Sequence, residues 1–207
     1  MNLHRVFIAT TLVLGVAAFS EAPSAQTDFA PKSHMVLANP ANLQGDRAEA
    51  VYLAIRQTMR AHYLASGDPV MGAYLTWRRY NTLPYRSAPH GELLVNNYAN
   101  APAARYGKYE DLGSLPAGSV VVKDSFIVTQ GGEVMTGPLF LMEKREAGFN
   151  AASNDWLFMM VEPTGAVVGI TNGKNSAAVR FCADCHNKAP KGQDNLLFMP
   201  EEVRRQN

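Results

Sequence analysis

The chain has 207 residues, 47% of them hydrophobic and 18% charged, and its formal net charge at pH 7 is +1. This length and composition support one domain with its own hydrophobic core. A net charge near zero gives no electrostatic reason to expect binding to nucleic acid or to an anionic membrane surface. Binding partners therefore have to be inferred from individual sites.

Residues 1–25 have the pattern of a cleaved secretory signal peptide. His4 and Arg5 precede an apolar run over Val6–Phe19, and small residues follow at positions 22–25. The run is shorter than the roughly 20 apolar residues that span a bilayer, and no later stretch is longer. We therefore expect an exported protein, periplasmic or secreted, without a membrane span in the mature chain. An uncleaved N-terminal anchor is the alternative interpretation.

The next segment, residues 26–44, contains prolines, asparagines and alanines without any periodicity. Such a composition is typical of exposed irregular chain. The sequence therefore predicts an exposed leader over 26–44 and one folded domain over 45–207.

The start of this domain has the strongest helical pattern in the chain. Asp46 and Glu49 resemble an N-terminal capping pair, and apolar residues then recur at helical spacing from Val51 onward. Ser66–Pro69 contains the Gly and Pro residues that end a helix. A second, short helix is predicted over 71–80.

From residue 93 onward the pattern changes to short β-rich runs separated by turn residues. Five strands are predicted: Leu93–Tyr98, Ser119–Val128, Pro138–Lys144, Trp156–Val161 and Ala166–Thr171. Pro163 to Gly165 separate the last two runs and predict a hairpin. The expected fold class is therefore α+β, a mainly antiparallel sheet with the predicted N-terminal helices at its edges.

The two cysteines of the chain, Cys182 and Cys185, lie three residues apart, and His186 follows at once in the sequence CADCH. In an exported protein this spacing is typical of covalent c-type haem attachment. Each thiol adds to one vinyl group of the haem, and the adjacent imidazole is the proximal iron ligand. We expect one haem c per chain with His186 as the metal ligand.

Three other interpretations of the cysteines were weighed. A structural disulfide is one, and a thioredoxin-like redox pair is another, although the βαβ unit that usually carries such a pair is not found. Half of a zinc site is the third, and it needs further ligands from His34, His62 or His90 without a second paired motif.

The far side of the iron has no obvious protein ligand in the sequence. Met199 is the one methionine that follows His186. Methionines inside apolar strands are more typical of core packing than of ligation, and this applies to Met135, Met142, Met159 and Met160. A five-coordinate haem with an open face is therefore favoured over an electron carrier whose sixth ligand is a methionine or histidine.

The segments VNNYAN, LPAGSVVVKDSF, GPLFLMEK and NDWLFMMVEPTGAV, followed by CADCH, resemble the cytochrome P-460 family, which includes the β-sheet form of cytochrome c′. The resemblance covers about Trp77 to Pro200. It implies a mainly antiparallel β fold, commonly a homodimer, around one pentacoordinate haem. Namesake members oxidise hydroxylamine, pass electrons to other cytochromes and carry a covalent link between a lysine and the porphyrin edge.

By its position after PAGS, the linked lysine of the family corresponds to Lys123. Strand alternation places Lys123 on the same face as Val121 and Ser125. The alternative is an ordinary strand lysine that reaches solvent over apolar neighbours. Both interpretations stay open at the level of sequence.

The resemblance also identifies a departure from the hydroxylamine-oxidising members. The position of their distal carboxylate corresponds to Phe140, which cannot accept a proton. Glu133 and Glu143 are the other carboxylates near in sequence, although Glu143 alternates off the face of Phe140. An aromatic residue over the iron resembles the cytochrome c′ relatives, which bind nitric oxide and carbon monoxide in an apolar pocket.

Several further residues are candidates for the haem environment. Arg180, just before the motif, is expected to contact haem propionates, with residues 77–79 as weaker candidates. Phe181 and Phe198 are expected to pack on the haem or in the core. His90, in a turn flanked by Pro and Gly, is either a surface residue, which such turns favour, or a distal group.

Three functions follow from these expectations. The leading one is oxidation of hydroxylamine, with electrons passed to a periplasmic cytochrome. The second is non-enzymatic binding of nitric oxide or carbon monoxide, and the third is simple electron transfer.

Overall fold

The structure is a computed structural model, and it describes residues 32–206. The predicted signal peptide and residues 26–31 of the predicted leader lie outside the described residues. The α-helices are α1 (Gly45–Leu64), α2 (Pro69–Ala73) and α3 (Arg180–His186). The short 3-10 helices are η1 (Pro40–Asn42), η2 (Tyr74–Thr76), η3 (Ala88–His90), η4 (Ala104–Asp111), η5 (Ala151–Ser153), η6 (Ser176–Val179) and η7 (Glu201–Val203).

Nine strands of this part of the chain form one sheet in which every pair is antiparallel. They are β1 (Lys32–Val36), β2 (Arg78–Arg79), β3 (Tyr85–Ser87), β4 (Leu93–Ala99), β5 (Val120–Val128), β6 (Glu133–Thr136), β7 (Leu139–Lys144), β8 (Trp156–Val161) and β9 (Val167–Ile170). The order is β1-β6-β5-β7-β8-β9, and β4 pairs with β5 on one side and with β2 and β3 on the other. The predicted α+β class with a mainly antiparallel sheet is confirmed.

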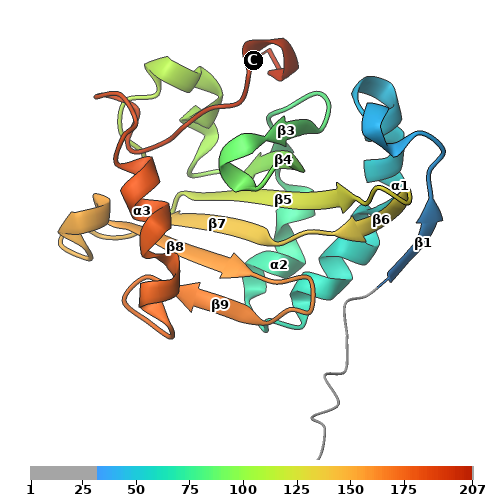
Figure 1. Ribbon diagram of the computed structural model, residues 1–207. Coiled ribbons are helices and arrows are strands. Elements are labelled where there is room, and N and C mark those ends of the chain that lie inside the picture. Colours follow the sequence, from blue (N-terminus) through green and yellow to red (C-terminus); the bar gives the residue numbers. More distant parts are fainter. Residues whose placement is uncertain (1–31, 207) are drawn as a thin grey trace, which may run out of the picture.

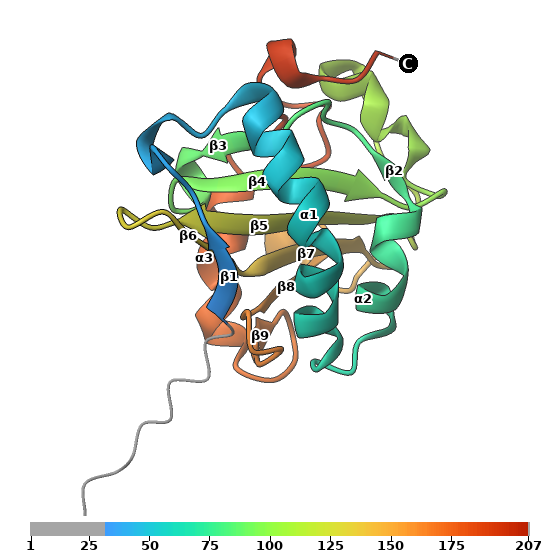
Figure 2. The same cartoon turned by 90° about the vertical axis from the view of Figure 1, so that its right-hand side faces the viewer.

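The sheet has two differently covered faces (Figures 1 and 2). Helices α1 and α2 cover one face, and α3 lies against the other. Strand β5 supplies both faces because its side chains alternate. Val122 and Phe126 belong to the hydrophobic core under α1, whereas Val121 belongs to a second core on the α3 side.

The predicted first helix is confirmed as α1, which buries Val51, Ile55 and Met59 against the sheet. Its predicted capping pair is wrong. The helix begins one residue before Asp46, and the Glu49 carboxylate binds the Arg79 guanidinium instead of the helix start.

The second predicted helix is shorter than expected. Helix α2 ends at Ala73, and after a 3-10 turn the chain extends as β2. The backbone pairing of Arg78 with Ala99 and of Arg79 with Tyr98 fixes this extended conformation. Pairing with a distant strand therefore overrides the local helical pattern.

All five predicted strands form, as β4, β5, β7, β8 and β9, and β8 pairs with β9 as the predicted hairpin. The predicted exposed leader over 26–44 is too long, because part of this segment belongs to the folded domain. Residues 32–36 form strand β1, which pairs with β6, and Leu43 is buried in the main core. The composition of residues 26–44 did not indicate β1, because a short edge strand is held in place by backbone pairing with its neighbour.

Within residues 32–206 no helix is both long and apolar enough to cross a membrane.

Candidate functional site

A cavity of about 300 Å³ lies on the α3 side of the sheet. Strands β5, β7 and β8 contribute to it, together with α3, the η3 turn, residues 196–198 and Pro200. Its aromatic lining includes Phe140, Phe158, Phe181 and Phe198, and its size suits a bound organic ligand. Cys182, Cys185 and His186 all line it.

The η6 segment that leads into α3 can lie close to the sheet because β9 carries a glycine at the contact. A Cβ atom on Gly169 would lie 2.5 Å from the Asn175 carbonyl oxygen and 3.2 Å from the Val179 side chain. Val179, directly before α3, is buried there. On the helix, Cys182 and Cys185 are three residues apart and so lie on neighbouring positions of one face.

His186 is held in one orientation by a backbone contact. Its Nδ1 donates a hydrogen bond to the Asn195 carbonyl oxygen at 2.8 Å, because a carbonyl can only accept. The proton on Nδ1 leaves a lone pair on Nε2, the state in which a histidine binds a metal. Burial, together with the Lys123 charge, lowers the pKa of His186 to about 4, so that the ring is neutral at pH 7.

The Asn195 carbonyl is itself fixed by a buried ion pair one residue earlier. The Lys144 ammonium donates to Asp194 Oδ1 at 2.7 Å, and the Leu115 backbone N–H donates to Oδ2 at 2.9 Å. The Trp156 indole donates to the Asp194 carbonyl at 2.8 Å. This group, Lys144, Asp194 and Trp156, is called the Asp194 clamp below.

Lys123 lies in the cavity, as strand alternation predicts. It pairs in register with Asn97 on β4 and with Phe140 on β7, so the three side chains lie side by side on one face. Burial lowers the pKa of Lys123 to about 8. Phe140 lines the same cavity. Whether Lys123 bonds to a haem stays a prediction.

His90 lies in the cavity. The Pro and Gly of its turn had favoured a position on the surface instead. Its ring packs edge-on against Phe140 with centroids 4.7 Å apart, and Ser87 Oγ lies 2.8 Å from its Nδ1. Burial, with the charges of Lys123 and His186, lowers the pKa of His90 to about 3. No sequence signal indicated this, because the folding of η3 over β5 and β7 depends on long-range packing.

Three predicted site residues do not line the cavity. Glu133 is exposed on β6, and Glu143 pairs with Arg145 at 3.1 Å. Arg180 is exposed at the start of α3. Among the residues that line the cavity there is no aspartate or glutamate.

Of the methionines considered as iron ligands, Met142 and Met159 line the cavity. Met199 is buried in the core on the α3 side but does not reach the cavity surface. Both lining methionines are also packed in the hydrophobic cores. Core packing therefore accounts for each of these three side chains.

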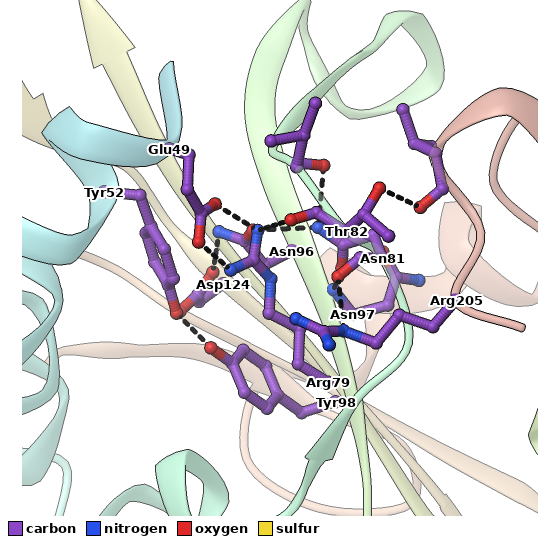
Figure 3. A network of polar contacts seen from close by, with 12 residues as sticks. Glu49, Tyr52, Arg79, Asn81, Thr82, Asn96, Asn97, Tyr98, Asp124 and Arg205 are labelled. Carbon is purple, nitrogen blue, oxygen red and sulfur yellow. Dashed lines mark hydrogen bonds and ion pairs between the residues drawn. The ribbon is translucent and has the colours of Figure 1, made fainter. Parts of the chain in front are cut away.

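Residues 77–79 do not line the cavity. Arg79 instead forms two hydrogen bonds with Glu49, at 2.7 and 2.6 Å, and its guanidinium lies over the Tyr52 ring (Figure 3). Trp77 packs against the core under α1. Trp77 and Arg79 therefore contribute to the opposite side of the sheet, whereas Arg78 lies over the ring of Tyr80.

The same network contains the buried carboxyl group of Asp124 (Figure 3). Tyr52 and Tyr74 donate to Oδ2 at 2.8 and 3.3 Å, and Asn96 donates to Oδ1 at 3.0 Å. The Tyr98 hydroxyl hydrogen-bonds to that of Tyr52. Burial raises the pKa of Asp124 to about 6, although these donors and Arg79 oppose the shift.

The cysteines do not have the properties of a redox pair. Both are free thiols, and burial raises the pKa of Cys182 to about 11, whereas a reactive redox cysteine needs a lowered pKa. Nor do residues 35–206, the part of the chain whose side chains are described, contain any group of three or more His, Cys, Asp and Glu side chains that could hold a metal ion. The zinc alternative therefore has no ligand set in this part of the chain.

The residues present fit a covalently attached haem. Two thiols on one helix face, an imidazole with Nε2 unprotonated and an aromatic cavity beside them are the groups that such a cofactor requires. No family model and no curated protein matches the chain.

Proposed function

We propose that the protein is an exported c-type cytochrome related to the P-460 family, whose open haem face binds a small diatomic ligand such as nitric oxide. Cys182 and Cys185 form the thioether bonds, and His186 is the proximal ligand. The observation that carries the proposal is the convergence of both thiols, the His186 ring, Lys123 and Phe140 on one apolar cavity.

Bound haem supplies an iron that can take up a diatomic molecule at its free coordination position. The chain's residues supply the surroundings. Asn195 orients His186, and aromatic side chains make most of the cavity lining apolar. Phe140 offers neither a proton acceptor nor a ligand, so the pocket favours small, weakly polar molecules.

Binding is favoured over oxidation because the cavity lining has no carboxylate. Oxidation of hydroxylamine removes protons from its nitrogen, and a general base for this step has to lie within hydrogen-bond reach. His90 is the one imidazole in the cavity besides His186, and its lowered pKa makes it a weak base. A periplasmic location and a homodimer belong to the same proposal.

The proposal is tested by covalent retention of haem. The protein is produced with a c-type haem maturation system, denatured in detergent and stained for haem, and the pyridine haemochrome spectrum is recorded. Wild type is expected to retain haem through denaturation, and Cys182→Ala/Cys185→Ala is expected to retain none. Asp184→Ala, between the cysteines but exposed, is the matched control and keeps the haem. Folded wild-type protein without covalent haem would refute the proposal.

Hydroxylamine oxidation is the second candidate, and the placement of Lys123 in the cavity favours it. A covalent bond from this amine to the porphyrin would broaden the reduced Soret band and move it to longer wavelength. For diatomic binding we expect an ordinary high-spin c-type spectrum that is the same in wild type and Lys123→Met. A broad, red-shifted band that Lys123→Met abolishes together with hydroxylamine oxidation would replace the first proposal by the second.

A further inference from the structure

We infer that His90 donates a hydrogen bond from its Nε2–H to the small molecule held in the cavity, and that Ser87 is the positioning residue that orients its ring. This inference rests on the proposed haem function and adds to it the group that selects among ligands.

The proton on the His90 ring is placed by its two neighbours. Ser87 Oγ lies 2.8 Å and Lys123 Nζ lies 3.4 Å from Nδ1. An ammonium group can only donate, so Nδ1 accepts. A neutral imidazole whose Nδ1 accepts carries its proton on Nε2.

The Nε2–H group is available to the contents of the cavity. His90 lines the cavity and packs against Phe140, and no residue among 32–206 forms a hydrogen bond with Nε2. Nε2 is also not one of the buried side-chain atoms without a partner among the described residues, so a molecule in the cavity can reach it. A ligand atom with partial negative charge accepts a hydrogen bond from it.

Donation is favoured over direct ligation of iron by His90. Ligation through Nε2 needs a lone pair there, which moves the proton to Nδ1. That proton would face the Lys123 ammonium, and the contact between the two would change from attraction to repulsion. The observed contacts therefore favour the donor role.

A neutral donor gives the pocket a defined selectivity. The cavity has a mostly aromatic and aliphatic lining without carboxylates. No carboxylate of this lining therefore competes with a diatomic molecule for the N–H group of His90. The Nε2–H group of His90 then favours the ligand whose outer atom is more negative. Nitric oxide and dioxygen are stabilised more than carbon monoxide.

The test uses carbon monoxide bound to the reduced, haem-loaded protein as a reporter of this donor. A hydrogen bond to the outer oxygen lowers the C–O stretching frequency. In His90→Leu we expect the frequency to rise and nitric oxide to dissociate roughly 3–10 times faster, the factor that one hydrogen bond supplies. His90→Gln keeps an N–H donor and is expected to restore part of both effects.

Two further variants define the origin of the effect. Ser87→Ala is expected to broaden the C–O band and shift it in the same direction by a smaller amount, because the ring loses one orienting contact. His62→Leu replaces a half-buried histidine in α1, which contacts Thr136, and is expected to change neither frequency nor rate.

The outcomes separate this inference from the proposed function. A wild-type protein that forms no haem–carbonyl band overturns both. A normal band that is identical in wild type and His90→Leu overturns the role of His90 alone. A wild-type reduced spectrum that is low-spin and becomes high-spin in His90→Leu also overturns it, because His90 is then an iron ligand.

Discussion

Replacing Asp194 by alanine is expected to lower the free energy of unfolding by about 3–5 kcal/mol, the effect of removing one partner from a buried ion pair. The side chains of Lys144 and Asp194 are 11% and 2% exposed. The variant leaves the Lys144 ammonium without its anionic partner and the Leu115 N–H without an acceptor. Urea denaturation followed by tryptophan fluorescence measures the loss.

A matched control lies in the same part of the sheet. Glu143 and Arg145 form an ion pair whose side chains are 30% and 44% exposed. Such pairs contribute about 0–1 kcal/mol because water competes with them. Glu143→Ala should therefore change the unfolding free energy little. Equal effects of Glu143→Ala and Asp194→Ala would contradict the role of the Asp194 clamp.

The Asp194 clamp also has a consequence for the proposed haem site. Asn195 follows Asp194 directly, and its carbonyl accepts the His186 Nδ1 hydrogen bond. Loss of the carboxylate therefore frees the backbone that orients the proximal imidazole. In the haem-loaded Asp194→Ala protein we expect heterogeneous His–Fe stretching bands, measured by resonance Raman spectroscopy, with the thioether bonds intact.

Asp124→Asn is expected to gain stability relative to wild type as the pH rises from 4 to 7, by about 2 kcal/mol of the roughly 3 kcal/mol that the full pKa difference corresponds to. The pKa of Asp124 is about 6 in the folded protein, against a usual value of 3.8. Each pKa unit corresponds to about 1.4 kcal/mol. Measuring urea denaturation of both proteins across this range gives the difference directly.

The sign follows from proton binding. The folded state holds the proton of Asp124 more tightly than the unfolded state, so this group stabilises the fold fully below pH 3.8. The stabilisation is lost as the pH rises through 6. Histidines with lowered pKa values act in the opposite direction, but they are the same in both proteins. Tyr52, Tyr74 and Tyr98, the tyrosines of the network, have raised pKa values and do not titrate here. A difference that is flat from pH 4 to 7 would show that Asp124 has an ordinary pKa.

Much of the fold could be predicted from sequence because its main elements carry their own patterns. Helix α1 buries residues at helical spacing, and β5, β7 and β8 are apolar runs bounded by turn residues. Strands β1 and β6 are not apolar runs of this kind: β6 pairs with β5, and β1 pairs with β6 at the edge of the sheet. The periodicity of apolar residues indicates which side chains are buried, but it does not indicate which backbone segments pair at the edge of a sheet.

The candidate site was predictable to the same extent. CADCH and Lys123 could be placed because a motif and strand alternation fix them. The Asp194 clamp and His90 could not, since each depends on contacts between segments about 30 to 50 residues apart. Three charged residues were candidates because they are near the motifs in sequence: Glu133, Glu143 and Arg180. None of them lines the cavity.

Lys123 and Asp124 are consecutive on β5, one in the cavity and the other in the tyrosine network beneath α1. A slip of β5 by one residue would turn each of the two side chains to the opposite face of the sheet. The carboxylate would then enter a lining of phenylalanines, and the ammonium would meet tyrosine hydroxyls and the Arg79 guanidinium. A strand whose two faces are both apolar tolerates a shift in register, and both faces of β5 are largely apolar. The adjacent opposite charges therefore help to fix the register of β5, because a sheet in which β5 is shifted by one residue is electrostatically unfavourable on both faces.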